Sequence, residues 1–148
     1  MNRTAVSTTH AIAFVMALAL GIAPRAKADA NACAAAINGH HFAYATTGSI
    51  VAAPIASIVG PFAEVGVQYF DGKGNVSFRF NASQNGSIGP GTATGTYVLN
   101  DDCTGTFTET SDGFTAHYSF AAADNGYDFH AICQDAGVVV TRDARRQF

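Results

Sequence analysis

The sequence of 148 residues predicts an all-β protein, an antiparallel up-and-down β-barrel of about eight strands. Three observations support this prediction. Beyond residue 28, apolar residues recur at alternate positions, and no stretch has them at helical spacing for three turns. Gly-, Asn- and Asp-rich turns separate the alternating runs, and none of the connections is a long crossover. Closure of such a meander removes the exposed edges of its sheet.

An immunoglobulin-like β-sandwich is the alternative fold. Such a sandwich usually buries a tryptophan between its two sheets. This chain contains no tryptophan, so the barrel is the first choice.

Residues 1–28 have the features of a secretory signal peptide. Arg3 provides a positive n-region, the apolar run 11–23 is too short to span a bilayer, and residues 26–28 form an A-x-A cleavage site. We therefore expect export to the periplasm or the extracellular space, as from a Gram-negative bacterium. Residues 29–148 are expected to form one barrel domain with no integral membrane segment.

The expected mature chain is acidic. Residues 1–28 hold three of the eight basic residues and no acidic ones, which leaves five basic against eleven acidic residues and a net charge of −6. A nucleic-acid partner needs a basic patch. The one basic cluster, Arg142, Arg145 and Arg146, is interrupted by Asp143, and we interpret it as a solvated final strand and tail. No nucleic-acid partner is expected, and the oligomeric state stays open.

The expected strands follow one another along the domain. An apolar, proline-interrupted connection at 48–60, with room for one helical turn, joins the first two, and a Gly-rich loop at 71–75 leads to the third. The polar segment 81–91 is predicted to be a mobile loop. The expected strand ranges are 40–44, 62–70, 76–80, 92–99, 103–110, 114–122, 127–133 and 138–142.

The pair Asn125-Gly126 is the strongest hairpin signal, because a type I′ turn needs positive φ at both central residues. The register that this turn sets places Tyr118 opposite Cys133, on an apolar face that should point into the barrel. His117 and His130 then lie on the wet face, about four residues apart, or roughly 13 Å. That separation is too large for a shared metal ion, so we expect neither a metal site nor a cofactor.

The inward aromatic side chains are the most informative feature. On the second strand the apolar alternation places Val65, Val67 and Tyr69 inside, and Glu64 outside. The aromatic set can fill a barrel of this size completely. It can also line a pocket for a small apolar or amphipathic ligand, oriented by tyrosine hydroxyls. The residues expected to face inward are Tyr69, Phe78, Phe80, Tyr97, Phe107, Phe114, Tyr118, Phe120 and Phe129.

Glu109 is a weak candidate for a catalytic group. It shares a face with Phe107 and could look into the mouth of the barrel. Burial there would raise the pKa of its carboxyl and suit it to general acid or base chemistry. The simpler interpretation is a solvated carboxylate at the rim.

Three cysteines allow three single disulfides, with one thiol left over. Exported chains generally oxidise their cysteines. Cys133 is expected to point inward as a small apolar residue, whereas Cys33 and Cys103 lie near the start of the domain and at a turn. We therefore expect a Cys33–Cys103 bridge, which in the chain-entropy model is worth roughly 4 kcal/mol. The alternative, Cys133 as a nucleophile, lacks a nearby base.

Several segments together resemble a group of small exported bacterial proteins with allene-oxide-cyclase-like or calycin-like β-barrels. The resemblance implies a barrel and cysteines at the positions of Cys33 and Cys103, departs from the group at Cys133, and implies no catalytic set. The segments are Ala32-Cys33 with Ile37 and Gly39, PFAEVG at 61–66, FDGKGNV at 70–76, GTYVLNDDCTGT at 95–106, and Val139-Val140 with Arg145-Arg146-Gln147.

The expected function is non-enzymatic binding of a small apolar or amphipathic ligand inside the barrel. One alternative is a cyclase or isomerase that acts on a hydrophobic substrate, and another is a structural or surface-interaction module with a filled core. A cavity that touches Tyr97, Tyr118 and a buried ionisable group would favour the enzyme. A cavity without such a group would favour binding, and a solid interior would favour the structural role.

Overall fold

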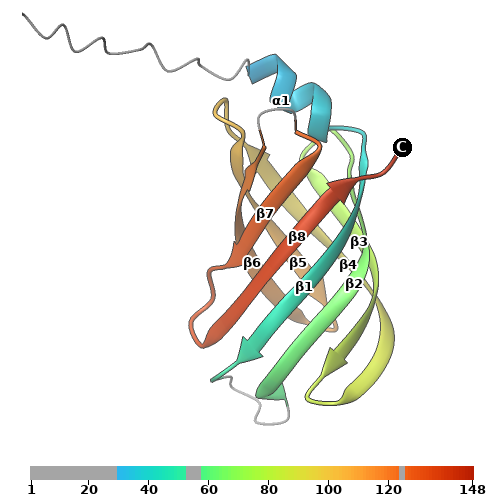
Figure 1. The fold of residues 1–148 in the computed structure, drawn as a ribbon, viewed down its shortest axis with the longest axis vertical. Coiled ribbons are helices and arrows are strands. Elements are labelled where there is room, and N and C mark those ends of the chain that lie inside the picture. Colours follow the sequence, from blue (N-terminus) through green and yellow to red (C-terminus); the bar gives the residue numbers. More distant parts are fainter. Residues whose placement is uncertain (1–29, 53–57, 124–125) are drawn as a thin grey trace, which may run out of the picture.

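A computed structural model describes residues 30–52, 58–123 and 126–148, and its strands form a closed antiparallel barrel (Figure 1). Each strand pairs with the next, and β8 closes the barrel against β1 in a register that runs from Phe42 opposite Arg146 to Ile50 opposite Val138. The predicted up-and-down barrel is confirmed. The elements are α1 (Ala30–Ile37), β1 (His41–Ile50), β2 (Gly60–Phe70), β3 (Asn75–Gln84), β4 (Ser87–Leu99), β5 (Thr104–Ser111), β6 (Phe114–Ala122), β7 (Asp128–Cys133) and β8 (Val138–Arg146).

Some expected features fall outside the described residues. These are the proposed signal peptide, residues 53–57 of the 48–60 connection, and Asn125 of the Asn-Gly turn. Gly126 of that turn is described and has φ +65°. The register predicted from the turn is confirmed, because Tyr118 pairs with Cys133 across β6 and β7.

The β3–β4 hairpin corrects the prediction of a loop at 81–91. β3 continues to Gln84, β4 begins at Ser87, and only Asn85-Gly86 lies between them. These two residues have φ of 48° and 86°, as a type I′ turn requires. The Ser-, Asn- and Gly-rich sequence on either side obscured the strands, because β-propensity reflects packing against neighbours more than an intrinsic backbone preference.

Two glycines on the inner face make room for the large side chain of Phe80 on β3. Phe80 pairs with Gly66 on β2 and with Gly91 on β4. At Gly91 the Phe80 ring occupies the space that a Cβ atom would need, and at Gly66 a Cβ would meet the Phe80 backbone and Cβ. Glycine at both positions therefore lets Phe80 turn into the barrel between the flanking strands.

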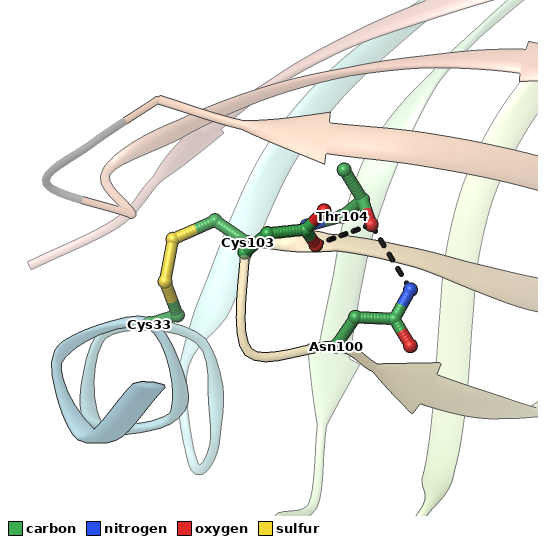
Figure 2. The surroundings of a disulfide bond; sticks show 5 residues. Cys33, Asn100, Cys103 and Thr104 are labelled. Atoms are coloured by element: carbon green, nitrogen blue, oxygen red, sulfur yellow. Dashed lines mark hydrogen bonds between the residues drawn. A yellow bond between two sulfur atoms is a disulfide. The ribbon is translucent and has the colours of Figure 1, made fainter. Parts of the chain in front are cut away.

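The helix α1 was not expected, because its eight residues are too few for a helical pattern over three turns. It lies across one end of the barrel (Figure 1), where Ile37 is fully buried and belongs to the core. A disulfide joins Cys33 of α1 to Cys103, with the two Cα atoms 5.4 Å apart (Figure 2). The predicted Cys33–Cys103 pairing is confirmed, and Cys133 is free and buried.

The turn between β4 and β5 presents Cys103 to the helix. Cys103 has φ +64°, which is uncommon for a residue with a side chain. Hydrogen bonds hold this conformation: Asn100 Nδ2 donates to Thr104 Oγ1 at 2.9 Å, and Thr104 donates from N and Oγ1 to Asp102 Oδ1 (Figure 2). The Asn-Asp-Asp sequence before Cys103 thus positions the disulfide.

The half of the interior next to α1 is filled by aromatic side chains. Phe70 packs edge-on against Phe42 and Tyr97, with ring centroids 5.7 and 4.8 Å apart. Phe120 and Phe129 continue this packing, with centroids 5.5 Å apart. Full burial of each such side chain is worth about 1.5–3 kcal/mol. This half of the barrel is a solid core, so an open site must lie nearer the other end.

Candidate functional site

The middle of the barrel contains a buried arginine. Arg142 lies on β8 between Val140 and Ala144 on the inner face, and only 1% of its surface is exposed. This corrects its assignment to a solvated strand. The polar residues Thr141, Asp143 and Arg145 occupy the outer face of β8, so strand alternation leaves Arg142 inside.

Three strands, β1, β2 and β5, supply the four hydrogen-bond partners of Arg142. Its Nε donates to Thr46 Oγ1 at 2.8 Å and Nη1 donates to Gln68 Oε1 at 3.3 Å. Its Nη2 donates to Glu64 Oε1 at 3.1 Å and to Glu109 Oε2 at 2.7 Å. We call these five residues the polar cluster. A buried charge is tolerated only when it is paired and hydrogen-bonded in this way.

Aromatic rings enclose the guanidinium group. Its central carbon lies 4.0 Å from the ring centroid of Tyr44 and 4.9 Å from that of Tyr118. The negative faces of these rings stabilise the cation in a site without bulk water. Although burial alone lowers the pKa of Arg142, the adjacent Glu109 carboxylate and the other acidic groups raise it above its ordinary value. Arg142 is therefore a permanent positive charge.

Glu64 has the most perturbed carboxyl group of the cluster. Burial, together with the nearby charge of Glu109, raises its pKa to about 7, against the opposing effects of Tyr44 and Arg142. The Tyr44 hydroxyl donates a hydrogen bond to Glu64 Oε1 at 2.5 Å, and burial also raises the pKa values of Tyr44 and Tyr118. Glu64 thus exchanges its proton near neutral pH, where its two tyrosine neighbours stay protonated.

The stability of the fold should depend on this proton. Because the pKa of Glu64 rises from an ordinary value of 4.5 to about 7 on folding, the folded state retains a proton that the unfolded chain loses between these values. The resulting stabilisation is complete below pH 4.5 and is lost as pH rises through 7, by roughly 3 kcal/mol in total. Denaturant unfolding measured from pH 5 to 8 should show this decline, and Glu64→Gln should remove it.

A matched variant controls for other titrating groups. Asp101 is exposed in the turn between β4 and β5, at the end of the barrel that α1 covers, so Asp101→Asn should keep the decline between pH 5 and 8. A Glu64→Gln protein with the same slope as the original would contradict the assignment to Glu64.

The end of the barrel away from α1 contains a cavity. It consists of two adjoining hollows of about 340 and 390 Å³, which we call the mouth cavity. A cavity of this size suits a small organic molecule. Both hollows are lined by Ile50, Ile58, Phe62, Phe114, Ala116 and Tyr118.

The inner end of the mouth cavity is polar. Glu64 and Glu109 line it, with 5% and 8% of their surfaces exposed, whereas Arg142 does not line it. The Tyr118 hydroxyl makes no hydrogen bond to any residue that the structure describes, although Tyr118 is only 5% exposed. The apolar walls therefore end at carboxyl and hydroxyl groups with unused hydrogen-bonding capacity.

The eight aromatic residues predicted to line a pocket fall into three groups. Phe80 and Tyr118 line the mouth cavity, as does Phe114 at its rim. Tyr69 lies on the outer face, where its ring stacks on His41 with centroids 4.5 Å apart. The remaining five are buried in the core: Phe78, Tyr97, Phe107, Phe120 and Phe129.

Tyr97 is far from the site proposed for it. Its hydroxyl donates a hydrogen bond to Asn38 Oδ1 at 2.5 Å, at the end of the barrel that α1 covers. The cavity expected to favour an enzyme was to touch Tyr97, Tyr118 and a buried ionisable group. The mouth cavity touches Tyr118 and two such groups, Glu64 and Glu109.

The faces of β2 are the reverse of the prediction. Glu64, Gln68 and Phe70 are buried, whereas Val65 is 59% exposed. Apolar alternation misled here, because this part of the interior is polar and the outer face is apolar. The hairpin register contained the correct signal, because Phe70 pairs with Val76 across the 71–75 loop. Paired residues lie on the same face of the sheet, so the inward-facing Val76 places Phe70 and every second residue before it on the inner face of β2.

The interpretation of Glu109 as a solvated carboxylate at the rim is wrong, because only 8% of its surface is exposed. Glu109 is buried beside Arg142 and on the cavity wall, where a catalytic role stays a hypothesis. Thr46, Gln68 and Tyr44 were not singled out, because an isolated polar residue in a strand shows no sign of a partner on another strand. Gln68 Nε2 is a buried donor without a hydrogen-bond partner among the described residues.

His117, His130 and Cys133 each lie beside a carboxylate. His117 and His130 are exposed and bonded to Asp135 and Asp143, at 2.8 and 2.6 Å. Burial raises the pKa of the Cys133 thiol, which disfavours the nucleophilic thiolate. Residues 30–52, 58–123 and 126–148 contain no group of three potential metal ligands. They also contain no helix long and apolar enough to cross a membrane.

Comparison with known proteins returned no match to a family model, to a curated protein or to a solved structure. The resemblance to allene-oxide-cyclase-like or calycin-like barrels stays a prediction.

Proposed function

We propose that this barrel binds a small amphipathic molecule in the mouth cavity. The apolar part of the ligand lies against Phe62, Phe80 and Phe114, and its polar end meets Glu64 and Tyr118 at the inner end. The observation that supports this proposal most directly is the composition of the cavity: it combines a largely apolar lining with the buried carboxyl groups of Glu64 and Glu109.

Hydrogen bonding supports the same proposal. Among the described residues, the Tyr118 hydroxyl and the second oxygen of Glu64 make no hydrogen bond. When a ligand displaces solvent from the cavity, its polar end can bond to these two groups. A wholly apolar ligand would leave them unpaired, at a cost of about 1–3 kcal/mol each.

We place this binding in an exported protein. The Cys33–Cys103 disulfide is consistent with an oxidising compartment. The signal-peptide features of residues 1–28 support periplasmic or extracellular binding.

A second candidate is a cyclase or isomerase that acts on a hydrophobic substrate. The observation that favours it is the Glu64 carboxyl, which lies on the cavity wall with a pKa of about 7. A group of this kind can take a proton from a bound substrate and return it at another position. Glu64→Gln should then abolish turnover, while a neutral molecule still binds.

Filling the cavity should weaken binding. Ala116 lines both hollows, so Ala116→Leu places three further carbon atoms inside them. We expect the affinity for the neutral fluorescent dye N-phenyl-1-naphthylamine to fall at least tenfold, measured by fluorescence titration.

The control lies on the same strand. Ala121 is exposed on the outer face of β6, and Ala121→Leu should bind the dye as the original protein does. Equal affinity in both variants would exclude the mouth cavity as the binding site. No saturable binding in the original protein would favour the structural module with a filled core.

A further inference from the structure

We infer that the ligand of the mouth cavity is cationic, an amphipathic amine whose protonated nitrogen binds between Glu64 and Tyr118. This inference rests on the proposed function and names the class of ligand. It follows from the charges that face the cavity and from those that do not.

The cavity presents acidic groups to its occupant. Glu64 and Glu109 line its wall, whereas Arg142 lies beyond them. All three guanidinium nitrogens already donate to residues of the polar cluster. A ligand carboxylate would meet two carboxyl groups before it could reach the arginine, and it would have to displace one of them.

The polar cluster has one more acidic group than it has basic groups. Glu109 forms the closer ion pair with Arg142, at 2.7 Å, and Glu64 is the more distant partner, at 3.1 Å. A protonated amine beside Glu64 makes the numbers of positive and negative charges equal. Charge-assisted hydrogen bonds of this kind are about twice as strong as neutral ones.

Tyr118 provides independent support for a ligand at this point. It is only 5% exposed, it lines both hollows, and its hydroxyl has no hydrogen-bond partner in the described chain. The hydroxyl oxygen can accept a hydrogen bond from an ammonium group. Tyr118, Phe62 and Phe114 also line the cavity with aromatic rings, whose faces attract cations.

Amine binding should release a proton from Glu64. The charged or titratable groups around its carboxyl are Tyr44 on β1, Glu109 on β5, Tyr118 on β6 and Arg142 on β8. An ammonium group favours the ionised carboxylate, so the carboxyl proton passes to the solvent. The affinity should therefore rise from pH 5 to pH 8 by up to roughly 100-fold, over a range in which an alkylamine stays protonated.

Three compounds of equal chain length test the ligand class. Octylamine, octan-1-ol and octanoate are each titrated at pH 7.5, below their micelle concentrations, against the protein loaded with N-phenyl-1-naphthylamine. We expect octylamine to bind at least tenfold more tightly than the other two. Because Cys133 lines the cavity, octylamine should also slow alkylation of its thiol.

The two possible failures are distinguishable. If octan-1-ol or octanoate binds as tightly as octylamine, the cavity binds amphipathic molecules and the inference of a cationic ligand is wrong. If none of the three compounds binds and the dye does not bind, both the inference and the proposed function are wrong.

Glu64→Gln and Asp101→Asn remove the same formal charge at different places. Glu64→Gln should lower the affinity for octylamine roughly tenfold or more and leave the affinity for octan-1-ol unchanged. Asp101→Asn should change neither affinity. Equal losses of octylamine affinity in both would indicate general attraction to an acidic protein and overturn the inference.

The original protein offers a test that needs no variant. Calorimetry in buffers with different ionisation enthalpies should show release of about half a proton per octylamine at pH 7, because the pKa of Glu64 is about 7. Octylamine binding without proton release, and with the same affinity at pH 5 and pH 8, would contradict the assignment to Glu64.

Discussion

Replacement of Arg142 by alanine is expected to lower the free energy of unfolding by about 3–5 kcal/mol. The substitution leaves Glu64 and Glu109 buried without their cation and removes donors from Thr46 and Gln68. It also leaves a void beside the Tyr44 and Tyr118 rings. Urea unfolding followed by circular dichroism would measure the loss.

Arg145 provides the matched control on the same strand. Its side chain is 84% exposed and lies 3.6 Å from Asp128, so Arg145→Ala should cost no more than about 1 kcal/mol. Combining Arg142→Met with Glu64→Gln and Glu109→Gln removes all three charges and should recover much of the loss. Equal stabilities of Arg142→Ala and Arg145→Ala would contradict the role of Arg142 as the centre of a buried charge cluster.

Removal of the disulfide should have an effect of similar size. The bridge spans a separation of 70 residues, and the double substitution Cys33→Ala with Cys103→Ala should cost about 4 kcal/mol in the chain-entropy model. For a domain of this size that corresponds to a fall in Tm of roughly 15 °C. Thermal unfolding under non-reducing conditions would measure it.

Reductant provides the control for this second effect. It should lower the Tm of the original protein toward that of the double variant and leave the variant unchanged, because Cys133 is free. A double variant with the original Tm would show that contacts such as the burial of Ile37 hold α1 in place without the cross-link.

Local sequence carried enough information for the architecture. Alternation and turn residues predicted eight strands in consecutive order, and the Asn125-Gly126 pair predicted the register of β6 and β7 correctly. The same logic applied to Asn85-Gly86 would have predicted the β3–β4 hairpin, but the polar strands beside it resembled a loop. Turn chemistry proved a better guide here than hydrophobicity, because it is encoded within two residues.

The candidate site was predicted only in part. Tyr118 was expected to face inward, and an inward Glu109 was the weaker of two interpretations; both residues line the mouth cavity. Arg142 was assigned to solvent as part of a basic cluster, and Glu64 because it lies on the face opposite Val65 and Val67. Their burial depends on each other: Arg142 is 78 residues from Glu64 and 33 from Glu109 along the chain.

The strand order, most of the turns and the pairing of Cys33 with Cys103 were predictable from the chain alone, since local patterns and a small number of cysteines constrain these features. The inward face of β2, and the division of the interior into an aromatic core, a polar cluster and a cavity, became clear only in the folded protein. Local patterns do not reveal them, because the cost of burying a charge depends on its neighbours. Closure of the barrel brings the hydrogen-bonding neighbours of Arg142 together from β1, β2 and β5.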